Sequence, residues 1–195
     1  EYLHPRRVCE SIENDQAELG IVSYPRGSRT IQAESWRKEP IVLVCSPNHP
    51  FATRINVALS DLHGQKLVGF DQDLVIRQEI DKAFDSADVR PTVAMEFDNI
   101  ETIKRAVEIN AGMALLPEPC VCHEVDRRTL VKLPIADVLL IRPLGIIYGR
   151  GKPLSATARR FLELLRIHAQ DLGENNNDYP DSQECPRDLT VVGIA

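Results

Sequence analysis

The stretch KLVGFDQDLVIRQEIDKAFDSADVRPTVAMEF, residues 66–97, decides the fold class. Its two ends, KLVGF and TVAMEF, are short apolar runs with the composition of strands. Between them, residues 73–86 place apolar side chains at helical spacing and so predict a helix with an inward face of Ile76, Ile80, Ala83 and Phe84. A strand, a helix and a second strand in this order form a βαβ unit.

A second unit of the same kind follows directly. Asn99 is placed to cap a helix whose apolar residues recur three and four positions apart, at Ile100, Ile103, Ala106 and Val107. That helix is expected to end near Gly112, before the strand MALLP. Strands that alternate with helices predict an α/β fold with largely parallel sheets.

The flanking sequence predicts two lobes. On the N-terminal side we expect a helix at 4–14, a strand at 19–22 and two strand-like stretches that end in EPIVLVCS. On the C-terminal side we expect one short helix over PEPCVCHEV, a strand over TLVKL, an extended run and a last amphipathic helix capped by Ser155. Long apolar strands at 40–46 and 138–148 bracket the βαβ units, as in a chain that crosses into a second lobe and returns.

The prediction is therefore two lobes, each a mostly parallel sheet flanked by helices, joined by two crossover strands. Residues 1–40 and 144–170 are assigned to lobe I and residues 41–143 to lobe II. Residues 171–195 contain few apolar side chains and are expected to form a disordered polar tail.

Composition excludes several classes of function. The chain has 195 residues, a formal net charge of −6 and a pI near 5.4. Because this charge disfavours contacts with phosphates, we expect any nucleic-acid binding to lie outside it. No apolar run approaches the roughly 18 residues of a membrane helix, and the first residues lack the apolar core of a signal peptide. The 5 cysteines have no regular spacing, which favours a reducing cytoplasm.

No catalytic, cofactor or metal motif stands out. The sequence contains no Gly-x-Ser-x-Gly, Walker loop, Gly-x-Gly-x-x-Gly or His-Glu-x-x-His, so we predict neither an enzyme nor a bound cofactor. Cys120, Cys122 and His123 form a Cys-x-Cys-His cluster, but no second ligand pair accompanies it, and a metal is not predicted.

Five segments in order resemble the effector-binding domain of LysR-type bacterial transcriptional regulators. They are AELGIVSYP, EPIVLVCSPNHPFA, LSDLHGQKLVGF, IETIKRAVEINAGMALLPE and LGIIYGRGKPLSATARRFLELL, and the resemblance as a whole covers residues 1–168. The resemblance implies a fold like that of type II periplasmic binding proteins, with a small-molecule effector held between the lobes. It also implies self-association as a homodimer or tetramer, and DNA binding only through a region absent from this sequence.

The sequence departs from the family pattern in small ways. Asn110-Ala111-Gly112 stands where the family usually has Gly-x-Gly, and Glu18 stands for its usual Asp. The helix-turn-helix and the first strand–helix unit of lobe I are missing, which we interpret as truncation.

The ends of the predicted strands supply the candidate site. In open α/β sheets, ligands bind beyond the carboxyl ends of strands, where helix N-termini present free N–H groups. The residues at those places, which match the family's effector contacts, are Ser23, Ser46, Phe70, Asp71, Phe97, Asp98 and Asn99. Each is equally interpretable as a strand-end or capping residue.

Arg77, near the start of the next helix, has two interpretations. It could pair with a ligand carboxylate, or it could form an ordinary helical ion pair with Asp81. Asp71, Asp73, Asp98 and Glu101 give the same region negative charge, which favours a cationic, metal-linked or neutral polar ligand over an anion.

Two other functions stay open from the sequence. A periplasmic solute receptor of a transporter shares the two-lobed architecture, although unpaired cysteines argue against an oxidising compartment. An enzyme on the same scaffold would use Asp71 or Asp98 as a general base.

Overall fold

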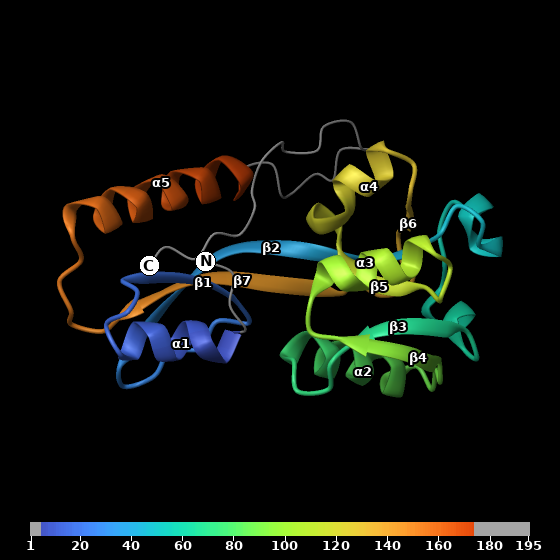
Figure 1. The fold of residues 1–195 in the computed structure, drawn as a ribbon, viewed down its shortest axis with the longest axis horizontal. Coiled ribbons are helices and arrows are strands. Elements are labelled where there is room, and N and C mark those ends of the chain that lie inside the picture. The colour runs from blue at the N-terminus through green and yellow to red at the C-terminus, as the bar shows by residue number, and fades with distance from the viewer. Residues whose placement is uncertain (1–4, 174–195) are drawn as a thin grey trace. The chain divides into compact units, whose positions relative to one another are not determined.

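A computed structural model describes residues 5–173 of the chain (Figure 1). The described residues divide into two compact units, residues 5–38 with 143–173 and residues 39–142. It passes from one to the other within two long strands, β2 (Ile31–Cys45) and β7 (Ile141–Gly149). Within residues 5–173, no helix is both long enough and apolar enough to cross a membrane.

The first unit is a sheet covered by one helix on each face (Figure 1). Its strand order is β1 (Leu19–Ser23), β7 and β2, and β1 runs antiparallel to β7. Because side chains alternate along a strand, Leu144 and Ile146 of β7 pack toward α5 (Ala156–Gly173), whereas Ile147 packs toward α1 (Pro5–Glu13). Two separate apolar layers result, one on each side of the sheet.

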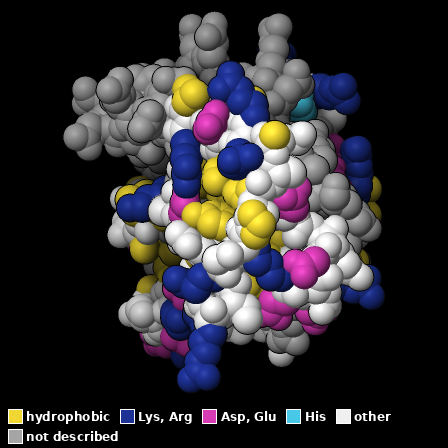
Figure 2. All heavy atoms as spheres, turned by 90° about the vertical axis from the view of Figure 1, so that its left-hand side faces the viewer, with side chains coloured by type: hydrophobic (Ala, Val, Ile, Leu, Met, Phe, Trp, Pro, Cys, Tyr) yellow, Lys and Arg dark blue, Asp and Glu magenta, His cyan; other side chains and the backbone are white. Residues whose placement is uncertain are grey.

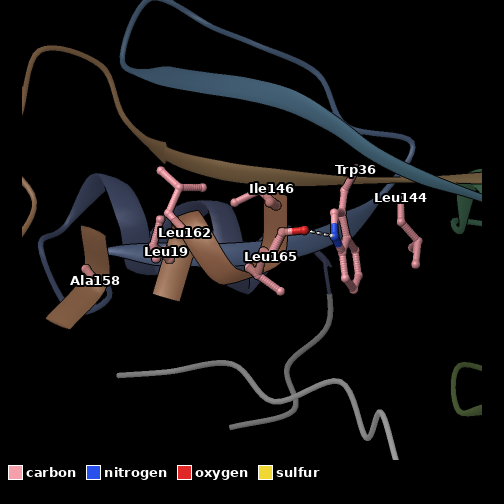
Figure 3. Close-up of a cluster of buried hydrophobic side chains, with 7 residues drawn as sticks. All are labelled: Leu19, Trp36, Leu144, Ile146, Ala158, Leu162 and Leu165. Atoms are coloured by element: carbon pink, nitrogen blue, oxygen red, sulfur yellow. Dashed lines mark hydrogen bonds between the residues drawn. The ribbon is translucent and has the colours of Figure 1, made fainter. Parts of the chain in front are cut away.

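The α5 layer is also tied by polar bonds (Figure 3). Trp36 of β2 lies in this core and its indole Nε1–H donates to the carbonyl oxygen of Leu165 at 2.9 Å. Arg166 pairs with Glu34 at 2.7 Å, and the hydroxyl of Tyr148 donates to the same carboxylate. These bonds attach the last helix to β2, and Tyr148 of β7 supports the Glu34 carboxylate that Arg166 contacts.

The second unit contains the two βαβ units. Strands β3 (Lys66–Phe70) and β4 (Thr92–Phe97) pair in parallel, and a parallel bridge from Leu67 to Met113 joins β3 to the strand β5 (Ala114–Pro117). The remainder of β2 runs antiparallel to β5 and to β6 (Val131–Leu133). The shorter elements are the 3-10 helices η1 (Pro50–Thr53), η2 (Leu59–Leu62) and η3 (Glu118–Val121), and the helix α4 (Cys122–Asp126).

The two helices of these units form as their apolar spacing predicts. In α2 (Val75–Ser86), Ile76, Ile80 and Phe84 are buried, while Ala83 is half-buried at the margin of that face. In α3 (Ile100–Glu108), Ile103, Ala106 and Val107 are buried. The helix α2 begins at Val75 rather than at residue 73, because Leu74 has an extended backbone at the N-cap.

Several other details differ from the sequence-based expectation. The two stretches expected before PNHP are one strand of 15 residues, β2, which is only partly buried in the first unit and is continuously buried from Ile41 to Cys45 in the second. The extended run expected from 138 becomes a strand only at Ile141. The single helix expected over PEPCVCHEV is a 3-10 turn followed by a short α-helix.

The sheets also hold more antiparallel pairs than expected. Parallel pairing follows from a helical crossover, and β3, β4 and β5 are joined in that way through α2 and α3. The pairs β1–β7, β2–β5 and β2–β6 lack such a connection and are antiparallel. Of the expected tail, residues 174–195 lie outside the described part of the chain.

Candidate functional site

Five of the eight candidate residues converge at one edge of the second unit's sheet. Phe70 and Phe97 are register partners at the carboxyl ends of β3 and β4, and the amide of Asp71 donates to the carbonyl oxygen of Phe97 at 3.0 Å. Asp98 and Asn99 follow directly in the loop that opens α3. A backbone hydrogen bond thus ties the first residue of the β3–α2 loop to the last residue of β4.

Asn99 fixes the start of α3. Its side-chain oxygen accepts from the amide of Glu101 at 2.7 Å and from that of Thr102 at 3.4 Å, as the sequence predicted for a cap. The cap orients the first turn of α3 toward the carboxyl edge of the sheet, and the Asn99 side chain is already engaged there. A ligand at this edge would therefore meet the loop backbone and the side chains of Asp71 and Asp98.

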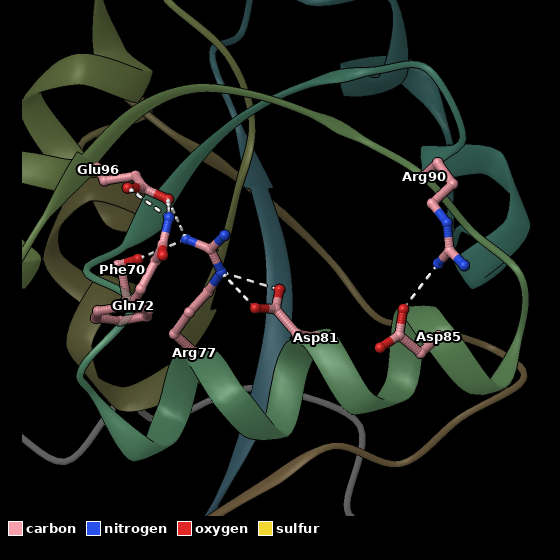
Figure 4. A network of polar contacts seen from close by, with 7 residues as sticks. All are labelled: Phe70, Gln72, Arg77, Asp81, Asp85, Arg90 and Glu96. Atoms are coloured by element: carbon pink, nitrogen blue, oxygen red, sulfur yellow. Dashed lines mark hydrogen bonds and ion pairs between the residues drawn. The ribbon is translucent and has the colours of Figure 1, made fainter.

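Arg77 is held by the protein itself (Figure 4). Its Nη1 donates to the backbone carbonyl oxygen of Phe70 at 2.8 Å and to Glu96 of β4 at 2.5 Å, and its Nε donates to Asp81 at 2.8 Å. The hydrogen bond from Arg77 holds the pKa of Glu96 below its usual range, against the opposing effect of burial. Of the two predicted roles, the structure shows the helical ion pair with Asp81. The hydrogen bond to the Phe70 carbonyl oxygen also fixes the start of the β3–α2 loop.

Ser46 does not join this group. Strand β2 runs antiparallel to β5, and β5 runs parallel to β3, so β2 ends at the edge where β3 and β5 begin. There Ser46 is buried, its hydroxyl lies 3.5 Å from the carbonyl oxygen of Glu108, and it accepts from the amide of Asn48. A strand end was predicted correctly, but at the opposite edge of the sheet from Phe70 and Phe97.

Ser23 lies in the first unit. It ends β1, is half-buried and is the register partner of Leu144 in β7. The structure therefore brings Phe70, Asp71, Phe97, Asp98 and Asn99 together, adds Arg77 as their support, and leaves Ser23 and Ser46 elsewhere.

The edge is acidic, as the sequence predicted. Asp71 is half-buried and Asp98 is exposed. Arg77, which contacts the carbonyl oxygen of Phe70, is paired with Asp81 and Glu96. Its charge is therefore already balanced before any ligand arrives.

Sequence reasoning missed a set of buried charges in the same unit. Glu39 is 1% exposed and Arg142 is 8% exposed, and the Nε of Arg142 donates to Glu39 at 2.9 Å. Lys104 of α3 is also buried, and pairs with Glu101 at 2.7 Å and with Glu124 at 2.9 Å. A sequence signal existed: Glu39 and Arg142 are charges of opposite sign, each followed by proline, in the two crossing strands.

The Cys-x-Cys-His cluster has ordinary partners. The thiol of Cys122 donates to the carbonyl oxygen of Glu118 at 3.5 Å, and the Cys120 sulfur accepts from Nη2 of Arg142 at 3.3 Å. Burial raises the pKa of the Cys120 thiol, outweighing the opposite influence of Arg142. Over residues 5–173, no three His, Cys, Asp or Glu side chains gather in a way that could hold a metal ion.

A family model for the LysR substrate binding domain matches residues 2–170. The chain belongs to this family. Transcriptional dual regulator GltC of Bacillus subtilis is 29% identical over 159 residues, which cover 81% of this chain and 53% of that protein. The RuBisCO operon transcriptional regulator of Allochromatium vinosum is 24% identical and covers 83% of this chain and 54% of its own length. The LysR domain described here thus spans about half the length of the curated relatives it matches.

Solved structures share its fold. The CcmR regulatory domain of Synechocystis, in complex with 2-PG, has a TM-score of 0.75 at 22% identity and covers 87% of this chain and 81% of that one. The effector binding domain of QuiR, in complex with shikimate, has a TM-score of 0.75 at 17% identity and covers 85% and 78%. The fold is the two-lobed α/β fold of LysR effector-binding domains, as predicted.

Family membership decides between the alternatives that the sequence left open. The relatives are transcriptional regulators, not enzymes or transport receptors. Asp71 and Asp98 therefore need no role as general bases.

Proposed function

We propose that this LysR domain is the small-molecule sensor of a bacterial transcriptional regulator, and that its effector contacts Phe70, Asp71, Phe97, Asp98 and Asn99. The observation that carries the site is the bond between the amide of Asp71 and the carbonyl oxygen of Phe97, which ties the start of the β3–α2 loop to the end of β4, where the β4–α3 loop begins. Ligands of open α/β sheets bind at this edge.

The sensor would act through a difference in the effector's affinity for two conformations of the protein. An effector changes the activity of a regulator only if it binds two arrangements of the protein with different affinity. The contacts must therefore include groups whose positions differ between the two arrangements, and we propose the loops that open α2 and α3 for this role. Arg77 supports these loops and is not counted among the ligand contacts.

Thermal unfolding with a panel of metabolites tests the site. The panel starts with 2-PG and shikimate, the ligands of two structures with the same fold, and adds amines and neutral polyols because the edge is acidic. We expect a binding compound to raise Tm, and Asp71→Asn to abolish most of that rise. Ser46→Ala is the matched control, since Ser46 lies at the other edge, and should leave the rise unchanged. A rise that survives Asp71→Asn and Asn99→Ala but is lost in Ser46→Ala contradicts the proposed site.

DNA binding is proposed for a part of the protein outside this chain. The face drawn in Figure 2 carries Lys and Arg interspersed with Asp and Glu around a small group of apolar side chains, rather than a basic stripe. Because its net charge is −6, the chain alone should not slow the migration of operator DNA in a gel-shift assay. We accordingly place the full protein in the cytoplasm, where it can reach DNA. Salt-dependent DNA binding by this chain alone contradicts the assignment.

Self-association is the second proposed partner interaction. Among the described strands, β4 pairs only with β3, and Val93 and Met95 on β4 are 39% and 44% exposed. An edge strand with exposed apolar side chains favours pairing with a second copy. Sedimentation equilibrium should show a dimer or tetramer that Met95→Lys weakens, whereas Ile55→Lys, at an exposed loop position, should not. Equal effects of the two variants argue against β4 as the contact.

A further inference from the structure

The buried Glu39–Arg142 pair and the buried Lys104 of the second unit both contact a single residue, Cys120. On one side, Arg142 of β7 and Glu39 of β2 form a pair that is almost fully excluded from water. On the other side, Lys104 of α3 pairs with Glu101 and Glu124. Cys120 stands in η3, which directly follows β5.

Cys120 contacts both pairs with different atoms. Its sulfur accepts a hydrogen bond from Nη2 of Arg142 at 3.3 Å, and its backbone carbonyl oxygen accepts one from Nζ of Lys104 at 3.1 Å. A continuous chain of polar contacts therefore runs from the crossing strands through η3 to α3 and α4. The hydrogen bonds to Glu101 and Glu124 keep Lys104 charged, raising its pKa although burial opposes this.

The buried ion pairs restrict movement of the elements that carry them. A buried ion that loses its partner is costly, so each pair resists a change in distance between the elements that carry it. Glu39 and Arg142 lie at the points where β2 and β7 enter and leave the second unit. Lys104 lies one turn after the Asn99 cap, on the helix that opens at the candidate site.

We propose that Cys120 is a positioning residue that links the effector-facing end of α3 to the two crossing strands, through its carbonyl oxygen to Lys104 and through its thiol to Arg142. The inference rests on the proposed function only for the statement that α3 faces the effector. A shift of α3 on ligand binding is then transmitted to β2 and β7 at Glu39 and Arg142.

Amide hydrogen exchange of the whole chain, without ligand, tests the link. Cys120→Ala removes the thiol contact and leaves both ion pairs intact, and we expect exchange in α3 and in residues 39–42 to accelerate by about threefold or more relative to α2. Cys120→Ser keeps an acceptor facing Arg142 and should restore most of the protection. Cys122→Ala is the matched control, because it removes a thiol two residues away that donates to Glu118, and should leave α3 and residues 39–42 unchanged.

The pattern of exchange distinguishes coupling through Cys120 from a general loss of stability. A uniform acceleration in α2 and α3 alike, or a change confined to η3 and α4, overturns the proposal. A double-mutant cycle provides a second measurement, since Lys104 and Arg142 share no direct bond but should be coupled. We expect Lys104→Met and Arg142→Lys to be non-additive in urea unfolding, and to become additive in the Cys120→Ala background; additivity in both backgrounds also overturns it. Because no ligand is used, failure here is distinct from failure of the proposed effector site.

Discussion

Arg77 donates a hydrogen bond of 2.8 Å to the backbone carbonyl oxygen of Phe70, the last residue of β3, which lies 7 positions earlier in the chain. The same nitrogen reaches Glu96 on the neighbouring strand β4. A single guanidinium thus holds the end of β3, the start of α2 and the end of β4 together. The geometry of the candidate site depends on this residue even though its charge is used within the protein.

Replacing Arg77 should therefore cost more than replacing an exposed arginine near the same helix. Arg77 is 12% exposed, and Arg77→Gln removes the guanidinium that donates to the Phe70 carbonyl oxygen, to Asp81 and to Glu96, with an expected loss of about 1–3 kcal/mol in the free energy of unfolding. Arg90, whose pair with Asp85 is exposed (Figure 4), is the control, and Arg90→Gln should change stability by less than about 0.5 kcal/mol. Urea unfolding measures both. Equal losses contradict the central role of Arg77.

Asn99→Ala should destabilise the start of α3. The variant loses the acceptor for the amides of Glu101 and Thr102, a change that typically costs about 1 kcal/mol. Asn99→Asp keeps an acceptor oxygen and should retain nearly full stability. Chemical denaturation compares the two, and an aspartate variant as unstable as the alanine variant argues against capping as the cause.

Gly112→Ala should destabilise the contact between β5 and β3. A Cβ at this position would lie 2.9 Å from the backbone carbonyl oxygen of Lys66, and backbone atoms of a paired strand cannot move aside cheaply. We expect a loss of about 1–3 kcal/mol, the range of overpacking. Gly64→Ala is an imperfect control because its φ is positive, so Gly27→Ala, whose nearest neighbour is at 3.6 Å, serves better and should be close to neutral. Thermal unfolding shows the difference.

Acid should weaken the attachment of α5. The hydrogen bonds from Arg166 lower the pKa of Glu34 below its usual 4.5, against burial and with help from Tyr148. A lowered pKa means that the contact stabilises the fold above pH 4.5 and that this contribution is lost as the pH falls through the folded value. Glu34→Gln should lower stability by about 1 kcal/mol at pH 7, and the difference should shrink toward pH 3.

Glu163→Gln is the control for this pH dependence. Glu163 pairs with Arg160 on the exposed side of α5, where both side chains are more than half exposed. Its replacement should leave the pH profile of Tm unchanged. A difference between wild type and Glu34→Gln that grows as the pH falls has the wrong sign for a lowered pKa and refutes the explanation.

The sequence alone determined the two βαβ units, the inward faces of α2 and α3, the Asn99 cap and the family. These features are local: helical periodicity, capping and strand composition are set by residues a few positions apart. It also placed Phe70, Asp71, Phe97, Asp98 and Asn99 at one edge, because consecutive parallel strands end on the same side of a sheet.

Only the tertiary structure decided which strand ends face which way and which charges are buried together. The antiparallel register of β2 moved Ser46 to the far edge, and strand direction is set by pairing rather than by the strand's own residues. Glu39 and Arg142 are 103 positions apart, and Cys120 joins their pair to Lys104 only because β2, β7 and η3 meet in the folded unit. Contacts between residues so far apart in the chain depend on packing that no local pattern encodes.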